Sequence, residues 1–110
     1  MTLDDYQTAA ARTLNARLTD AERMMDAAAG LAEEGGEVLS LVRKHLYQSH
    51  PLDRDRLATE LGDALWCLAA VAREAGLALD AVASANLDKL ERRYPEGYSD
   101  ARSVSRTDDE

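Results

Sequence analysis

Apolar side chains recur at helical spacing along most of this chain. In residues 3–18 they fall roughly on one line, which predicts a first helix over that stretch. The segment "LTDAERMM" then offers a capping box, with Thr19 as N-cap and Glu22 three residues later. We expect a long second helix to begin there and to end near Tyr47, ahead of Pro51.

Two further helices follow from the same pattern. The third is expected to begin near Asp53 and to stop at Gly76, a typical helix C-cap. The fourth opens at "LALDAV" and is closed by Pro95. No useful strand-like alternation is present, so the predicted fold class is all-α. Short links favour antiparallel neighbours, and we expect a bundle of about four helices.

Length and composition limit the domain organisation. With 110 residues, 45% of them hydrophobic and none of them Phe, the chain is long enough for one modest core filled by Leu, Val, Ala and Met. We therefore predict one domain over residues 1–97. Residues 98–110 are polar, lack periodicity and end in acid, so they are expected to form a flexible tail.

The charge, the lengths of the apolar runs and the single cysteine argue against several classes of protein. A formal net charge of -8 argues against binding nucleic acid, which requires clustered Lys and Arg. No apolar run is long enough for a membrane span, and the first residues do not resemble a signal peptide. Cys67 has no partner for an internal disulfide, which is typical of a reducing compartment. We expect a soluble, cytoplasmic protein.

Acidic residues interrupt the apolar face of the second helix. At about 100° per residue, Glu34 falls between Leu31 and Val38, and Glu37 lies one turn further along. A carboxylate buried without a partner is costly or becomes protonated, so it needs a compensating cation. Gly35 and Gly36 beside it would each weaken the helix by up to about 1 kcal/mol relative to alanine.

The third helix carries a second acidic pair. Glu60 and Asp63 are three residues apart and therefore neighbours on one helix surface. Across an antiparallel pair they can face the acids of the second helix. Lys or Arg side chains could neutralise such a cluster, or the acids could face solvent. Oxygen-only ligands favour a hard divalent ion, Mg²⁺ with Mn²⁺ as a substitute. A di-iron site would want Glu-x-x-His, which neither histidine provides.

"EEGGE" at 33–37 followed by "ELGD" at 60–63 resembles the signature of the MazG-like all-α nucleoside triphosphate pyrophosphohydrolases. "YQTAA", "GDALW" and "NLDKLERRYPEGY" are similar to other segments of that family. The resemblance implies Mg²⁺-dependent hydrolysis of a (deoxy)nucleoside triphosphate to monophosphate and pyrophosphate, in house-cleaning or control of the nucleotide pool. It implies that the metal ligands are Glu34, Glu37, Glu60 and Asp63. Glu33 would orient or deprotonate the attacking water, or bind an additional ion.

The resemblance also implies substrate-binding residues. Asn86, Lys89 and Arg93 share one face of the fourth helix. Lys89 and Arg93 would bind phosphate oxygens and Asn86 the sugar or phosphate, although a basic helix end is also favoured by the helix dipole alone. Tyr94 could stack on the nucleotide or cap the core. Trp66 could stack on the base or belong to the core.

Three hypotheses remain at this point. The first is the enzyme. The second is a non-catalytic helical module that binds nucleotide or protein in regulation. The third is a plain bundle with solvated acids, against which the position of Glu34 speaks. A unit this small needs a partner to bury its apolar faces, so we expect a homodimer or a homotetramer built as a dimer of dimers. Gly35 and Gly36 are expected to clear space for a neighbouring helix or a phosphate.

Overall fold

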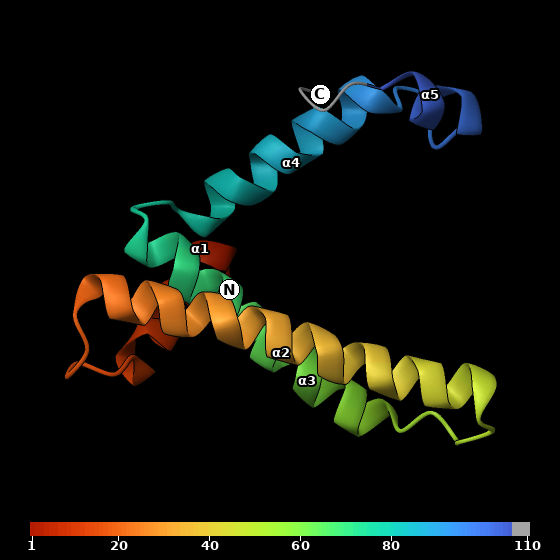
Figure 1. Ribbon diagram of the computed structural model, residues 1–110. Helices are drawn as coiled ribbons and strands as arrows, with labels where there is room; N and C mark the ends of the chain where they lie inside the picture. The colour runs from red at the N-terminus through yellow and green to blue at the C-terminus, as the bar shows by residue number, and fades with distance from the viewer. Residues whose placement is uncertain (107–110) are drawn as a thin grey trace.

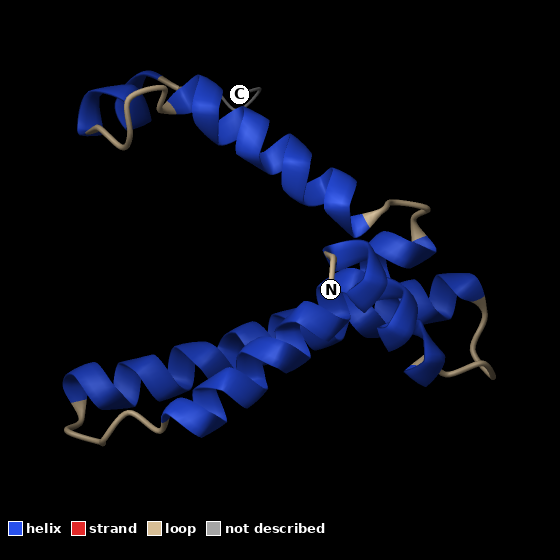
Figure 2. Ribbon diagram, turned by 180° about the vertical axis from the view of Figure 1, so that it is seen from behind, coloured by secondary structure: helices blue, strands red, loops and turns tan. Residues whose placement is uncertain are grey.

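Helices joined by short turns make up the protein in a computed structural model that describes residues 1–106 (Figure 1). No β-strand occurs within this range, which confirms the all-α class (Figure 2). None of its helices is long and apolar enough to cross a bilayer. The elements are α1 (Leu3–Ala10), the 3₁₀ turn η1 (Ala11–Thr13), α2 (Asp20–Tyr47), α3 (Arg54–Glu74), α4 (Leu79–Arg93) and α5 (Asp100–Ser105).

The first helix is shorter than the apolar pattern predicts. Instead of running over 3–18, α1 ends at Ala10 and passes into η1. Side chains compete with the helical backbone here: the Thr13 hydroxyl donates to the Ala10 carbonyl at 2.7 Å, and Asn15 accepts from the Arg17 amide at 3.0 Å. Leu14 is extended, with φ -66° and ψ 144°. The prediction of one continuous helix was therefore wrong beyond Ala10.

The second and third helices form the antiparallel hairpin that the sequence predicts. The capping box is confirmed, since Thr19 and Glu22 exchange side-chain to backbone hydrogen bonds at 3.2 and 2.9 Å. Asp53 caps α3 by accepting from the Arg56 amide at 3.0 Å. Gly76 follows α3 with φ +74°, a left-handed conformation suited to glycine.

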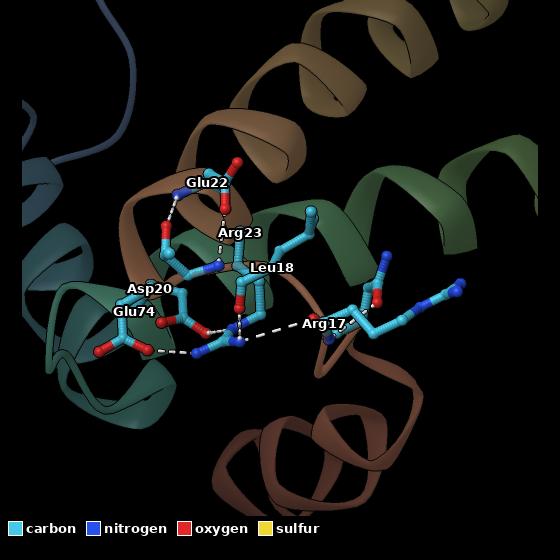
Figure 3. A network of polar contacts seen from close by, with 8 residues as sticks. Arg17, Leu18, Asp20, Glu22, Arg23 and Glu74 are labelled. Carbon is cyan, nitrogen blue, oxygen red and sulfur yellow. Dashed lines mark hydrogen bonds and ion pairs between the residues drawn. The ribbon is translucent and has the colours of Figure 1, made fainter.

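Two contacts fasten the hairpin. At its open end Arg23 donates to Glu74 at 2.9 Å and to the Leu18 carbonyl at 2.6 Å, and it also pairs with Asp20 (Figure 3). Midway along α2, a Cβ atom at Gly30 would lie 2.8 Å from the Cys67 sulfur. Gly30 therefore permits the close approach of α2 and α3.

A buried glutamine joins α1 to the turn between α3 and α4. The side-chain amide of Gln7 donates to the carbonyls of Ala69 and Leu77 at 3.2 and 3.0 Å. Its oxygen accepts from the Leu79 amide at 3.1 Å. Beside it lies a small core of Ala69, Ala72 and Leu79, with Tyr6 packed against them.

The fourth helix does not complete a bundle within one chain. It contacts α1 at its first turn, where the Asp80 amide donates to Asp4 at 2.8 Å, and then projects away from the α2–α3 hairpin (Figures 1 and 2). The radius of gyration is 16.8 Å, against about 13 Å for a compact chain of this size. The four helical stretches are present, but the closed four-helix bundle expected from the sequence is not formed by this chain alone.

The segment expected to be a flexible tail contains regular structure. Ser99 accepts from the Arg102 amide at 3.1 Å and caps α5, and the Tyr98 hydroxyl donates to Asp100 at 2.6 Å. The short helix forms because a serine cap and an acid in the first turn favour it, a signal that the polar composition obscured. Residues 107–110 lie outside the described part of the chain.

Candidate metal centre

Three carboxylates converge in the middle of the hairpin. Glu34 comes from α2, and Glu60 and Asp63 come from consecutive turns of α3. Each offers one oxygen, and these oxygens all lie within 4.8 Å of one another. The spacing of three residues on α3 and the antiparallel pairing with α2 therefore produce the convergence that the sequence pattern predicts.

Glu34 is the electrostatically unusual member of the group. Its pKa is raised from 4.5 to about 7. A proton shared with the Glu60 carboxyl contributes most, followed by burial and then by the negative charges of Glu60, Asp63 and Glu37. The Glu34 Oε2 atom is also buried without a hydrogen-bond partner among the described residues. Such an atom is rare in a folded protein and requires an explanation.

A hard divalent cation fits these residues. It would offset the repulsion of three neighbouring carboxylates, one of which, Glu34, has a buried oxygen without a partner in residues 1–106. The donors are all oxygen, which suits Mg²⁺ or Mn²⁺ better than softer metals. No lysine or arginine in residues 1–106 forms an ion pair with the cluster. The alternative that basic side chains neutralise the acids is therefore not what the structure shows.

The remaining acids of the motif lie beside the cluster on α2. Glu33 and Glu37 are both exposed. The charge of Glu37 helps to raise the Glu34 pKa, so this carboxylate lies within electrostatic reach of the group, although its oxygens are not among the three that converge. Glu37 also lines a cavity further along the hairpin.

Cys67 lies under the cluster and is not suited to act as a nucleophile. Burial raises the pKa of the thiol, and the negative charges of Glu34 and Asp63 raise it further. A thiol with a raised pKa holds its proton at neutral pH and is a weak nucleophile.

Trp66 is engaged in a contact with the N-terminal segment. Its indole nitrogen donates to the Thr13 hydroxyl at 2.8 Å, and it lines a hollow of about 10 Å³ with Ala10 and Leu14. This space holds about one water and no nucleobase. The contact favours the structural alternative for Trp66, and stacking on a base stays a prediction.

The predicted substrate residues of α4 are not brought to the carboxylates within one chain, because α4 leaves the hairpin (Figure 1). Asn86 is exposed, and Lys89 is half-buried. Arg93 is half-buried too, and its Nε atom has no hydrogen-bond partner in residues 1–106. Tyr94 packs on Tyr98, with ring centroids 5.3 Å apart. Their roles in binding nucleotide stay predictions.

A cavity next to Glu37, with two cations in its wall, was not predicted from the sequence. Its volume is about 290 Å³, and Lys44 and Arg56 contribute to its wall. Lys44 follows Glu37 by seven residues on α2, and Arg56 precedes Glu60 by four on α3. These spacings place both cations on the helix faces that carry the acids, which is the signal that could have found them.

The glycine pair beside the cluster faces open space. A Cβ atom at Gly35 or Gly36 would meet no atom within 4 Å, apart from its chain neighbours and the local helix backbone. No neighbouring helix of the same chain therefore needs their missing side chains. Clearance for a phosphate or for a second copy stays a hypothesis.

This arrangement defines an all-α protein whose central helical hairpin carries a candidate divalent-metal centre. The model of the MazG nucleotide pyrophosphohydrolase domain matches residues 23–98. The chain therefore belongs to the MazG family, whose enzymes are generally metal-dependent. The matched range contains the whole α2–α3 hairpin except its first turn, together with α4.

The chain is also similar to one curated protein. The Gene 37 protein of Mycobacterium phage L5 is 36% identical over a match of 72 residues, which covers 62% of this chain. The chain spans 63% of the length of that relative. No solved structure gives a significant match.

Proposed function

We propose that the protein is a Mg²⁺-dependent pyrophosphohydrolase that converts a (deoxy)nucleoside triphosphate to its monophosphate and pyrophosphate. The observation that carries the proposal is the convergence of one carboxylate oxygen each from Glu34, Glu60 and Asp63. Glu34 also has a buried oxygen without a hydrogen-bond partner in residues 1–106. Membership of the MazG family supports the reaction class. Control or cleaning of the cytoplasmic nucleotide pool is the role that suits this activity.

In this proposal Glu34, Glu37, Glu60 and Asp63 hold the metal. A bound metal would neutralise charge on the phosphate oxygens and would lower the pKa of water, which makes the water a better nucleophile. Glu33 is exposed next to Glu34 and accepts the proton of the attacking water. The water oxygen bonds to the α-phosphorus, the bond from that phosphorus to the bridging oxygen breaks, and pyrophosphate leaves with the electron pair.

A second copy of the chain completes the site in this account. Leu61, Leu65 and Leu68 form a stripe on α3 that is 52%, 37% and 39% exposed. In residues 1–106 no large side chain is fully buried, so one chain leaves much apolar surface uncovered. Association would cover this stripe and could bring Lys89 and Arg93 of one copy to the carboxylates of the other. Light scattering should therefore give a mass of two or four chains, and Leu65→Lys should lower it.

The activity is tested with purified protein, Mg²⁺ and a panel of natural and modified triphosphates. Pyrophosphate and orthophosphate are measured separately. The account expects pyrophosphate from at least one substrate, with a loss of at least about 100-fold in Glu60→Gln because a metal ligand is removed. Glu91→Gln is the matched control, since Glu91 is exposed on α4 and has no ion pair in residues 1–106.

The same assay separates the alternatives. A non-catalytic nucleotide- or protein-binding module would release no pyrophosphate above the background of Glu60→Gln, although it could still bind triphosphate. Release of orthophosphate instead would show that a different phosphate bond is cleaved.

A further inference from the structure

The closed end of the α2–α3 hairpin contains a cavity next to the candidate metal centre, beside a turn held by hydrogen bonds. The amides of Gln48 and His50 both donate to the Lys44 carbonyl, at 3.0 and 3.2 Å. The His45 ring Nδ1 lies 2.9 Å from the His50 carbonyl oxygen. Asp53 caps the first turn of α3. The turn that closes the cavity is therefore held by hydrogen bonds on both sides.

The cavity is large enough for a diphosphate. Its volume of about 290 Å³ is many times the roughly 10–15 Å³ that one water molecule needs in the same measure. The polar side chains of its wall are those of Glu37, Ser40, Lys44, His50, Asp53 and Arg56. A hydroxyl and two cations can donate hydrogen bonds to phosphate oxygens.

The cations of this wall are free to bind an anion. Neither Lys44 nor Arg56 forms an ion pair in the described part of the chain. Asp53 already accepts a hydrogen bond from the α3 backbone in its role as cap. Glu37, the other carboxylate of the wall, is shared with the metal centre. A divalent ion bound there would offset the negative charge that Glu37 brings to the cavity.

Negative and positive side chains are separated along the length of the hairpin. On α2, Glu34, Glu37 and Lys44 follow one another toward the turn at intervals of three and seven residues. On α3, Asp63, Glu60 and Arg56 follow the same direction at intervals of three and four. These intervals keep each series on one helix face. The carboxylates lie in the middle of the hairpin and the two cations at its closed end.

We propose that this cavity binds the β- and γ-phosphates of the substrate, so that pyrophosphate leaves toward the hairpin turn. Lys44 and Arg56 contact the phosphate oxygens. The α-phosphate then lies at the carboxylates, and the nucleoside extends away from the turn. This assignment rests on the proposed function and adds to it the direction in which the triphosphate lies.

The test compares two double variants of the full-length protein. Lys44→Gln with Arg56→Gln removes both cations of the cavity. Arg43→Gln with Arg54→Gln removes the same charge from neighbouring exposed positions that do not line the cavity. Circular dichroism and melting curves confirm that both fold. Calorimetry then measures binding of pyrophosphate, and separately of nucleoside monophosphate, in the presence of Mg²⁺.

The cavity variant should bind pyrophosphate at least about tenfold more weakly than wild type, because it loses two charge-assisted contacts. Monophosphate binding should change less than threefold, and the control variant should bind both ligands like wild type. Equal pyrophosphate affinity in wild type and the cavity variant would overturn the assignment. So would an equal loss in the two variants, because a long-range charge effect would then explain the result.

The activity assay and the calorimetry distinguish failure of the proposed function from failure of the cavity assignment. If wild type releases no pyrophosphate from any triphosphate, the proposed function is wrong, while the calorimetry still decides whether the cavity holds pyrophosphate. If wild type is active and the cavity variant keeps its pyrophosphate affinity, only the assigned direction of the substrate is wrong.

Discussion

Two polar side chains of this protein, Gln7 and Glu34, have opposite surroundings. Gln7 makes three hydrogen bonds, to Ala69, Leu77 and Leu79, and leaves no polar atom of its amide without a partner. Glu34 has a buried oxygen with no partner and lies among other acids. Gln7, which joins α1 to the turn between α3 and α4, has all its side-chain polar atoms hydrogen-bonded. The Glu34 oxygen that is left unsatisfied belongs to the carboxylate cluster of the candidate metal centre.

The largest effect on stability should come from removing the hydrogen bonds of the Gln7 side chain. Gln7→Leu keeps the apolar part of the side chain but removes all three hydrogen bonds, including the one that pairs the buried Leu79 amide. We expect the free energy of unfolding to fall by about 3 kcal/mol, measured by urea denaturation. The chain's other glutamine, Gln48, is exposed, and Gln48→Leu should change stability by no more than about 0.5 kcal/mol. Equal effects would mean that the Gln7 contacts contribute little.

Two glycines of α2, Gly30 and Gly35, should change stability in opposite directions when they are replaced by alanine. Gly30→Ala places a Cβ atom against Cys67 and should lower stability by about 1 kcal/mol, because overpacking outweighs the gain in helix propensity. Gly35→Ala meets open space and should raise stability by up to about 1 kcal/mol. Thermal melts of both variants measure this.

The contact itself can be checked in a second background. Adding Cys67→Ala to Gly30→Ala removes the sulfur and should recover most of the stability lost through crowding. Stabilisation by Gly30→Ala alone would contradict the close approach of the two helices. Replacing both Gly35 and Gly36 by alanine without loss of activity would remove their clearance role.

The last effect concerns pH. Without metal, folded Glu34 holds its proton up to a pKa of about 7, whereas the unfolded chain loses it near 4.5. The folded state therefore binds more protons between these values, and its stability falls as pH rises through that window. Glu34→Gln should remove this part of the slope. Melting temperatures of the metal-free proteins at pH 5 and pH 8 test it, and parallel curves would contradict the raised pKa.

The hairpin and its acids could be predicted because local signals specify them. Apolar periodicity, the Thr19 capping box and the three-residue spacing of Glu60 and Asp63 are all contained within a few turns of helix. The Gln7 tie could not be predicted, since its partners lie 62 to 72 residues away and an isolated glutamine has no pattern. The same holds for the direction of α4, which depends on contacts made only at its first turn. The early end of α1 rests on Thr13 and Asn15, whose competing hydrogen bonds the apolar pattern does not include.

The most direct test of the central claim is a calorimetric titration of Mg²⁺ into the metal-free protein at pH 8, for wild type, Glu34→Gln and the control Glu91→Gln. The account predicts saturable binding in wild type and in the control, with affinity at least about tenfold weaker in Glu34→Gln. Indistinguishable titrations for all three proteins would contradict the assignment of the carboxylate cluster as a metal centre.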